Sequence, residues 1–114
     1  MNDYLTVFEQ YKDIKEIADL SEEVKRLREY FGNGQYDRMI QHINSLTVKY
    51  AVETIMWNAA NRTMPASFQQ SYINAESFLR LKGYSVLLEK GIKVQDRLTA
   101  EELDSIKSTF RTAM

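Results

Sequence analysis

The chain has 114 residues, of which 15 are Lys or Arg, 16 are Asp or Glu and one is His, so its formal net charge is −1 at pH 7. This length suffices to bury a hydrophobic core without a metal or crosslink, and the absence of Cys excludes disulfides, thiolate metal sites and a cysteine nucleophile. A small, mixed net charge does not point to nucleic acid as a partner.

The composition, with only four Gly and one Pro, favours helix along most of the chain. We therefore expect residues 1–114 to form a single all-α domain, a compact bundle of four to five helices with short loops. Asp3 and Glu9 interrupt the first apolar positions, so no signal peptide is expected, and no apolar run approaches the length of a bilayer span. The expected location is cytoplasmic.

The first 31 residues carry apolar side chains at intervals of three and four, as on one face of a helix. They are Tyr4, Val7, Phe8, Tyr11, Ile14, Ile17, Ala18, Leu20, Val24, Leu27 and Phe31. We slightly favour one long N-terminal helix over about 3–31, and the alternative is two helices that meet near Ser21. The "GNG" at 32–34 ends this region. Residues 1–24 hold seven acidic side chains, an arm suited to a basic surface of the same chain or of a second copy.

Residues 36–62 contain no strong helix breaker, so we expect helical structure there, with a kink considered at Asn44 and Ser45. Two apolar stripes run along this segment. The first comprises Val48, Ala51, Val52, Ile55, Met56 and Ala59, and the second comprises Met39, Ile43, Leu46, Tyr50 and Trp57. We assign the first stripe to the core and expect the second to include a contact surface.

The next helix is predicted to begin at Ser67, which forms a capping box with Gln70. It has two apolar faces, one with Phe68, Tyr72, Ala75, Leu79 and Val86 and the other with Ile73, Leu81, Tyr84 and Leu88. Gly83 inside it indicates a kink or a close helix contact. Lys90, Gly91 and Ile92 are typical of a helix end. A hairpin over Tyr84–Val94 is the less favoured alternative.

The last helix has the clearest start signal in the chain. Thr99 and Glu102 form a capping box, and Leu98 and Leu103 occupy the two positions of a hydrophobic staple.

Catalytic and metal-binding groups are scarce. The single histidine, His42, has no carboxylate within one helical turn, so we interpret it as a solvated or capping side chain rather than a general base. The acidic pairs Glu22–Glu23 and Glu101–Glu102 fall in expected first helical turns, where carboxylates favour the N-terminal end of the helix dipole. We expect no catalytic residues, no metal and no cofactor.

The sequence therefore favours a non-enzymatic interaction module: an adaptor, inhibitor or assembly factor that occupies a surface of another protein. By analogy alone, small accessory proteins of phages and mobile elements look similar. The predicted partner-binding residues are Met39, Ile43, Leu46, Tyr50, Trp57, Asn58, Asn61 and Arg62. Because the middle helices are apolar on two sides, we also expect a homodimer.

A helical nucleic-acid-associated regulator is the alternative, because residues 48–82 resemble a helix-turn-helix in outline. Its contact residues would be Arg62, Gln69, Gln70 and Asn74. No Lys or Arg lies between Arg62 and Arg80 to bind phosphates, so this alternative ranks second.

Overall fold

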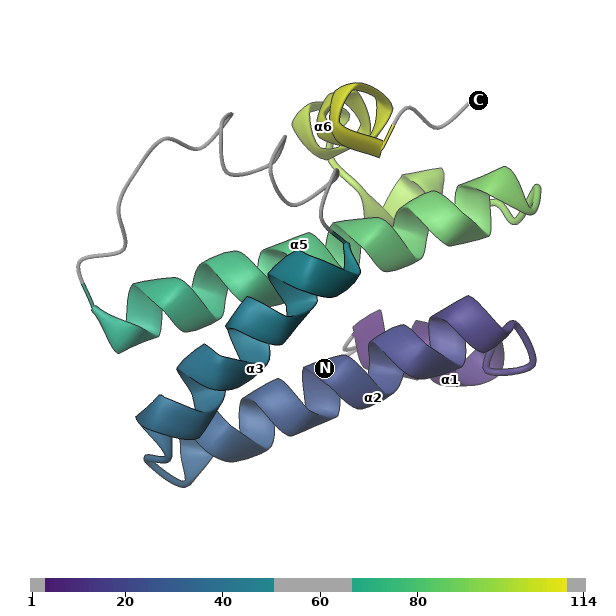
Figure 1. Ribbon diagram of the computed structural model, residues 1–114. Coiled ribbons are helices and arrows are strands. Elements are labelled where there is room, and N and C mark those ends of the chain that lie inside the picture. Colours follow the sequence, from purple (N-terminus) through teal and green to yellow (C-terminus); the bar gives the residue numbers. More distant parts are fainter. Residues whose placement is uncertain (1–3, 51–66, 111–114) are drawn as a thin grey trace. The chain divides into compact units, whose positions relative to one another are not determined.

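The computed structural model describes residues 4–50 and 67–110, and these ranges contain helices and no strand (Figure 1). The elements are α1 (Tyr4–Gln10), α2 (Lys15–Gly32), α3 (Tyr36–Lys49), α5 (Phe68–Glu89), a short 3₁₀ helix, η1 (Gln95–Arg97), and α6 (Ala100–Phe110). The prediction of an all-α helical bundle is confirmed. Among the described helices, none is both long and apolar enough to cross a membrane.

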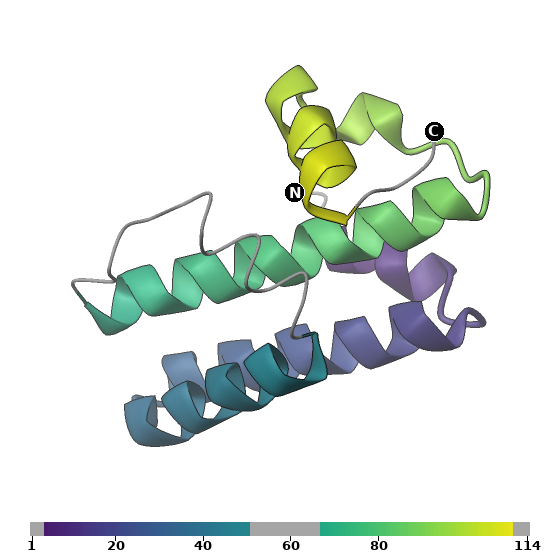
Figure 2. The same cartoon turned by 45° about the horizontal axis from the view of Figure 1, so that its top comes forward.

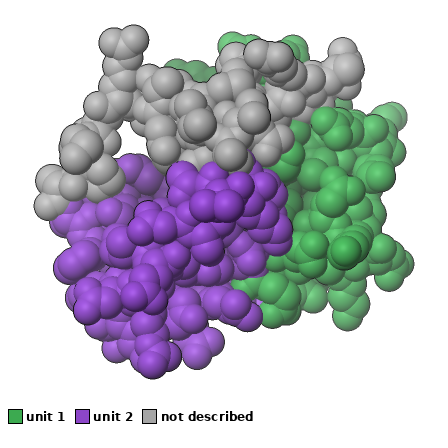
Figure 3. All heavy atoms as spheres, in the orientation of Figure 1, with its two compact units in different colours: residues 1–22, 79–114 green, residues 23–78 purple. Residues whose placement is uncertain are grey.

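The chain divides into two compact units, shown in different colours in Figure 3. Unit 1 contains residues 1–22 and 79–114, and unit 2 contains residues 23–78. Both boundaries fall inside helices, α2 and α5, so each of these helices contributes to both units. The single domain expected from the sequence stays a prediction, and the two units are described in turn.

The prediction of one long N-terminal helix over about 3–31 is wrong, because α1 and α2 are separate helices. Helix α1 ends at Gln10, and a tight turn follows in which the backbone N–H of Tyr11 donates to the carbonyl of Phe8 and that of Ile14 to the carbonyl of Tyr11, both at 3.0 Å. Ser21 Oγ, buried within α2, donates to a carboxylate oxygen of Glu9 at 3.1 Å. In one straight helix these residues would lie about 18 Å apart, so the bond requires the chain to reverse direction.

The second half of α5 forms the core of unit 1. From Leu81 to Leu88 every residue except Lys82 is buried, so both predicted apolar faces of this half are covered. Gly83 lies against the ring of Phe8, and a Cβ at residue 83 would stand 2.2 Å from Phe8 Cζ. The Phe8 ring also makes an edge-on contact with Tyr84, with centroids 5.5 Å apart. Gly83 thus marks a close contact between α1 and α5, as the sequence indicated.

Helix α5 ends at Glu89, just before the predicted stop signal, in which Gly91 has a φ of 80°. The N–H of Ile92 donates to the carbonyl of Leu87 and that of Gly91 to the carbonyl of Leu88, both at 3.0 Å, which is the Schellman pattern. The alternative hairpin over Tyr84–Val94 is wrong, because α5 runs through Glu89.

Helix α6 lies beside the second half of α5 in both Figure 1 and Figure 2. Its start is the predicted capping box: the N–H of Thr99 donates to a Glu102 carboxylate oxygen at 2.9 Å, and the N–H of Glu102 donates to Thr99 Oγ1 at 3.1 Å. Glu102 also forms an ion pair with Arg80 of α5. The guanidinium of Arg80 in turn lies 5.2 Å from the ring centroid of Tyr84 and 5.9 Å from that of Tyr4.

In unit 2, α2 and α3 are joined by the predicted "GNG" turn. Gly34 has a φ of 70°, the N–H of Gln35 donates to the carbonyl of Tyr30 at 2.8 Å, and that of Gly34 to the carbonyl of Phe31 at 3.2 Å. This is a second Schellman motif, and the left-handed conformation at Gly34 favours glycine.

The core-facing side of helix α3 differs from the predicted one. It continues without a break through Asn44 and Ser45 and ends at Lys49, while the rest of the predicted 36–62 segment lies outside the described residues. Val48, assigned to the core, is 81% exposed, whereas Met39 and Leu46 are buried. The assignment of the two stripes on α3 was therefore wrong for its described part, because the face that meets α2 and α5 is the one with Met39 and Leu46.

The start of α5 forms one of the two hydrogen bonds of the predicted capping box. The N–H of Gln70 donates to Ser67 Oγ at 3.1 Å, but the side-chain amide of Gln70 donates to Asn74 Oδ1 at 2.9 Å instead of returning to Ser67.

We predict that Gly83→Ala destabilises the fold. A new methyl group must displace the Phe8 ring, which is fully buried and held by Tyr84, and overpacking of this kind costs about 1–3 kcal/mol. The higher helix propensity of Ala offsets only about 1 kcal/mol of that cost. Urea unfolding measures the change. Gly32→Ala is the matched control, since nothing lies within 4 Å of its added Cβ, and equal stability of the two variants would contradict the close contact.

We also predict that Glu102 contributes to acid sensitivity. Burial alone would raise the pKa of Glu102, but the hydrogen bonds from Arg80 and Thr99 outweigh it and hold the pKa below its ordinary value of 4.5. A carboxyl whose pKa is lower in the folded than in the unfolded state stabilises the fold above the unfolded pKa, and this contribution is lost as pH falls through the folded pKa. The free energy of unfolding should therefore fall as the pH drops below about 4.5.

The measurement is urea unfolding from neutral pH to about pH 3 on the parent and on Glu102→Gln, in which this decline should be smaller. Glu101→Gln removes an exposed carboxylate from the same helical turn and serves as the control. The same decline in all three proteins would show that the Arg80–Glu102 pair has no part in it.

Candidate interaction surface

Unit 2 brings four aromatic rings from three helices into a continuous row, formed by Tyr72, Phe31, Tyr36 and Phe68 in that order; we call it the aromatic row. The rings of Tyr72 and Phe31 are stacked with centroids 4.4 Å apart, and those of Tyr36 and Phe68 are stacked at 4.8 Å. Phe31 and Tyr36 connect the two stacks at 5.9 Å with their planes tilted by 52°. The row links α2, α3 and α5.

The local sequence explains why these rings meet. Phe31 lies in the last turn of α2, and the turn at Gly34 reverses the chain so that Tyr36 becomes the first residue of α3. Phe68 is the first residue of α5, and Tyr72 follows four residues later on the same face of that helix. Two helix starts and one helix end thus contribute the four rings.

The inner end of the row is fixed by polar contacts. Arg28 Nε donates to a carboxylate oxygen of Glu76 at 2.7 Å, and the two side chains form an ion pair. The phenol of Tyr72 is hydrogen-bonded to Glu76. Burial, followed by the bond to Glu76 and the charge of that residue, raises the pKa of Tyr72 to about 12 in spite of the opposing effect of Arg28. The phenol is therefore protonated at neutral pH and donates to the carboxylate.

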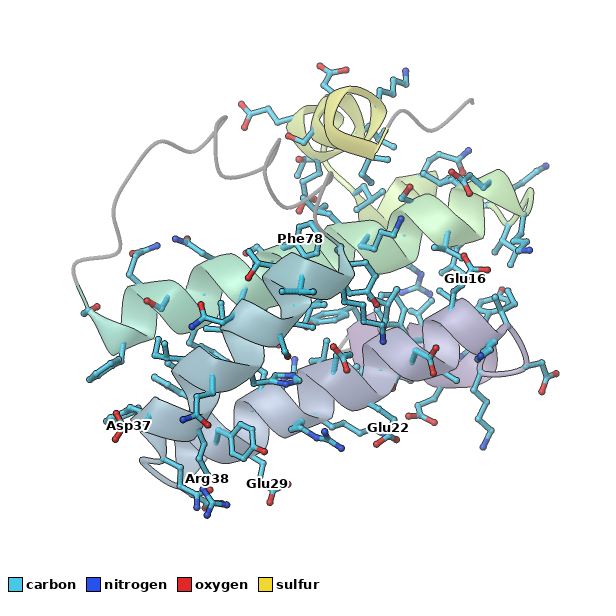
Figure 4. All side chains as sticks on the ribbon, in the orientation of Figure 1. Glu16, Glu22, Glu29, Asp37, Arg38 and Phe78 are labelled. Atoms are coloured by element: carbon cyan, nitrogen blue, oxygen red, sulfur yellow. The ribbon has the colours of Figure 1, made fainter. Side chains whose placement is uncertain are left out.

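The outer end of the row is exposed. Tyr36 is 37% exposed and Phe68 is 46% exposed, while Phe31 and Tyr72 are half-buried. The charged residues Asp37 and Arg38 follow Tyr36 directly in the first turn of α3, and both are exposed and project away from the helices in Figure 4. The surface thus presents two rings that are already ordered by stacking.

The order of the rings bears on the cost of covering them. Rings that are already ordered by stacking lose little side-chain entropy when a partner covers them. Their exposed area is apolar surface that contact with another molecule would remove from water.

The partner-binding residues predicted from the sequence do not belong to the aromatic row. Met39 and Leu46 are buried in unit 2, so their assignment to an exposed contact surface is corrected to core. Ile43 and Tyr50 are half-buried, and the ring of Tyr50 lies 5.9 Å from that of Phe78, labelled in Figure 4. Trp57, Asn58, Asn61 and Arg62 lie outside the described residues, and binding by them stays a prediction.

The residues of the nucleic-acid alternative fall at the start of α5. Gln69 and Gln70 are exposed and Asn74 is half-buried, with Gln70 and Asn74 hydrogen-bonded to each other. Arg62 lies outside the described residues. Nucleic-acid contact by these side chains stays a prediction.

His42 differs from its predicted solvated or capping state. Its exposed fraction is only 9%, its ring makes an edge-on contact with Tyr30 at 6.0 Å, and its buried Nε2 has no hydrogen-bond partner among the described residues. The correction follows from helix periodicity: His42 lies between Met39 and Leu46 on the buried face of α3.

Within residues 4–50 and 67–110, no group of three or more His, Cys, Asp or Glu side chains is placed to hold a metal ion. No protein family model, curated protein or solved structure matches this chain.

Sequence reasoning missed the aromatic row because it treated each helix separately. The apolar spacing assigns Phe31 to the stripe of the N-terminal segment and assigns Phe68 and Tyr72 to one face of α5. It indicates no role for Tyr36. A usable signal was present, since aromatic residues stand at both helix starts and just before the "GNG" turn. Which of them meet depends on how three helices pack.

Proposed function

We propose that this chain is a non-enzymatic protein–protein interaction module that works as an adaptor, inhibitor or assembly factor. The observation that carries the proposal is the pair of stacked, partly exposed rings of Tyr36 and Phe68 at the outer end of the aromatic row. Aromatic side chains are enriched among the residues that dominate protein–protein binding energy.

The rigidity of the row supports a binding role. Each stacked pair is worth about 0.5–1.5 kcal/mol beyond the area it buries, so the rings hold their positions before a partner arrives. The ion pair of Arg28 with Glu76 and the phenol of Tyr72 anchor the inner end. A partner that covers Tyr36 and Phe68 therefore meets an ordered apolar surface instead of two mobile side chains.

Two other exposed apolar side chains in the described part of unit 2 stand outside the row. Val48 and Ile73 are 81% and 44% exposed, but neither belongs to the row. Single exposed apolar residues are common on protein surfaces and imply no function. They supply the matched controls for a test.

We predict that the double substitution Tyr36→Ala and Phe68→Ala abolishes partner capture while the chain stays folded. Both residues stand at helix starts and are partly exposed, so the expected loss of stability is only about 1–2 kcal/mol from the lost stacking. The tagged full chain, the double variant and the control Val48→Ala with Ile73→Ala are each used to capture proteins from the native host. Mass spectrometry identifies the captured proteins, and circular dichroism confirms folding of each variant.

A protein retained by the parent and by the control, but lost by the folded double variant, is the expected result. If the double variant captures the same proteins in the same amounts as the parent, the aromatic row is not the interaction surface and the proposal for it is wrong.

A further inference from the structure

We infer that Asn33 is a site of spontaneous deamidation, in which the backbone nitrogen of Gly34 attacks the Asn33 side chain and leaves aspartate or isoaspartate in the turn between α2 and α3. This inference concerns the covalent chemistry of the turn and does not depend on the proposed interaction function. It follows from the residue pair, from its exposure and from the hydrogen bonds of the turn.

The residue pair favours the reaction. Asn33 is the only one of the six asparagines in the chain that is followed by Gly. Attack on an asparagine side chain by the next backbone nitrogen closes a five-membered ring, and a side chain on that next residue hinders the approach. Gly34 has no side chain, and nothing lies within 4 Å of the position where its Cβ would stand. The approach of its nitrogen to Asn33 is therefore sterically open.

The backbone of the turn holds the attacking nitrogen weakly. Asn33 and Gly34 follow the end of α2, and both are exposed. The N–H of Gly34 donates to the carbonyl of Phe31 at 3.2 Å, which is the long end of the usual range for such a bond. The neighbouring bond, from Gln35 to the carbonyl of Tyr30, is 2.8 Å long. The longer bond can open at the end of α2 while the body of the helix stays intact, and local openings of this kind need little free energy.

Asn44 provides a comparison within the same unit. It is exposed like Asn33 and is followed by a small residue, Ser45. It lies inside α3, however, where the hydrogen bonds of the helix fix the backbone on both sides. Attack at Asn44 requires several helical bonds to break together, so its side chain should react far more slowly.

The reaction consumes only water and releases only ammonia. The backbone nitrogen of Gly34 loses its proton to solvent and forms a bond to Cγ of Asn33, while the Cγ–Nδ2 bond breaks and the side-chain nitrogen takes up a proton and leaves as ammonia. Water then opens the cyclic imide at one of its two carbonyl carbons. Opening at the side-chain carbonyl gives aspartate, and opening at the main-chain carbonyl gives isoaspartate.

Both products alter the turn that places Phe31 near Tyr36. Aspartate adds a negative charge just beyond the C-terminal end of α2, where the helix dipole opposes it. Isoaspartate also adds one carbon to the main chain between the two rings, whose centroids lie 5.9 Å apart. The same carbon lengthens the loop that the bond from Gln35 to Tyr30 closes. Deamidation should therefore loosen the connection between the two stacks of the aromatic row.

The test follows the asparagines of the purified, folded full chain in warm, mildly alkaline buffer. Peptide mapping by mass spectrometry measures the replacement of each side-chain amide by a carboxyl group, and electron-transfer fragmentation distinguishes isoaspartate from aspartate. Asn33 should deamidate at least about tenfold faster than Asn44, because the end of a helix opens more readily than its interior. Circular dichroism establishes that the chain stays folded during the incubation.

The effect on the turn is measured by urea unfolding before and after the incubation. Asn33→Gln is the matched control, since its longer side chain would have to close a six-membered ring, which forms much more slowly. The midpoint of the parent should shift to lower urea as the product accumulates. The midpoint of Asn33→Gln should stay where it began, and any shift that it does show measures damage elsewhere in the chain.

Two results would overturn the inference. If Asn33 of the folded chain keeps its amide as long as Asn44 does, the turn protects it and the assigned site is wrong. If Asn33 deamidates but the parent and Asn33→Gln keep the same midpoint, the turn tolerates both products and the expected loosening of the aromatic row is wrong.

Discussion

The structure depends on the unequal burial of α5. Its second half is buried along most of its length, since from Leu81 to Leu88 every residue except Lys82 is buried. Removing so much apolar surface from water is the largest favourable contribution that one helix can make to a small domain. Gly83 permits the closest approach, that of Phe8, and Arg80 fixes α6 beside this half through Glu102. The exposed large apolar residues of α5, Phe68 and Ile73, stand in its first two turns.

The aromatic row occupies those first turns. Phe68 is exposed because it precedes the buried half of α5, and Tyr72 lies where the helix passes from exposed to buried. The stack of Phe31 on Tyr72 connects α5 to α2, and the stack of Tyr36 on Phe68 connects it to α3. The same rings therefore stabilise unit 2 and provide its exposed apolar surface. This dual role explains how a surface of only two exposed rings stays ordered without a partner.

The sequence predicted helix ends correctly where the contacts that set them join residues close together in the chain. Thr99 with Glu102, and the glycines at 34 and 91, set helix ends through bonds between residues a few positions apart, and these were predicted. The break between α1 and α2 was missed because no Gly or Pro marks it and the apolar spacing continues across it. Long-range contacts, Glu9 with Ser21 and Phe8 with Gly83, decide it instead. The core-facing side of α3 and the aromatic row were missed for the same reason, since both depend on which helices pack together.

The central claim is that the exposed end of the aromatic row is a contact surface. Hydroxyl-radical footprinting of the full chain, read by mass spectrometry on the free chain and on the chain bound to the protein that it captures from the native host, tests it most directly. Contact at the row predicts that Tyr36 and Phe68 are oxidised in the free chain and protected in the complex, while Val48 and Ile73 react equally in both. Equal oxidation of Tyr36 and Phe68 in the free and the bound chain, with protection elsewhere on the chain, would contradict it.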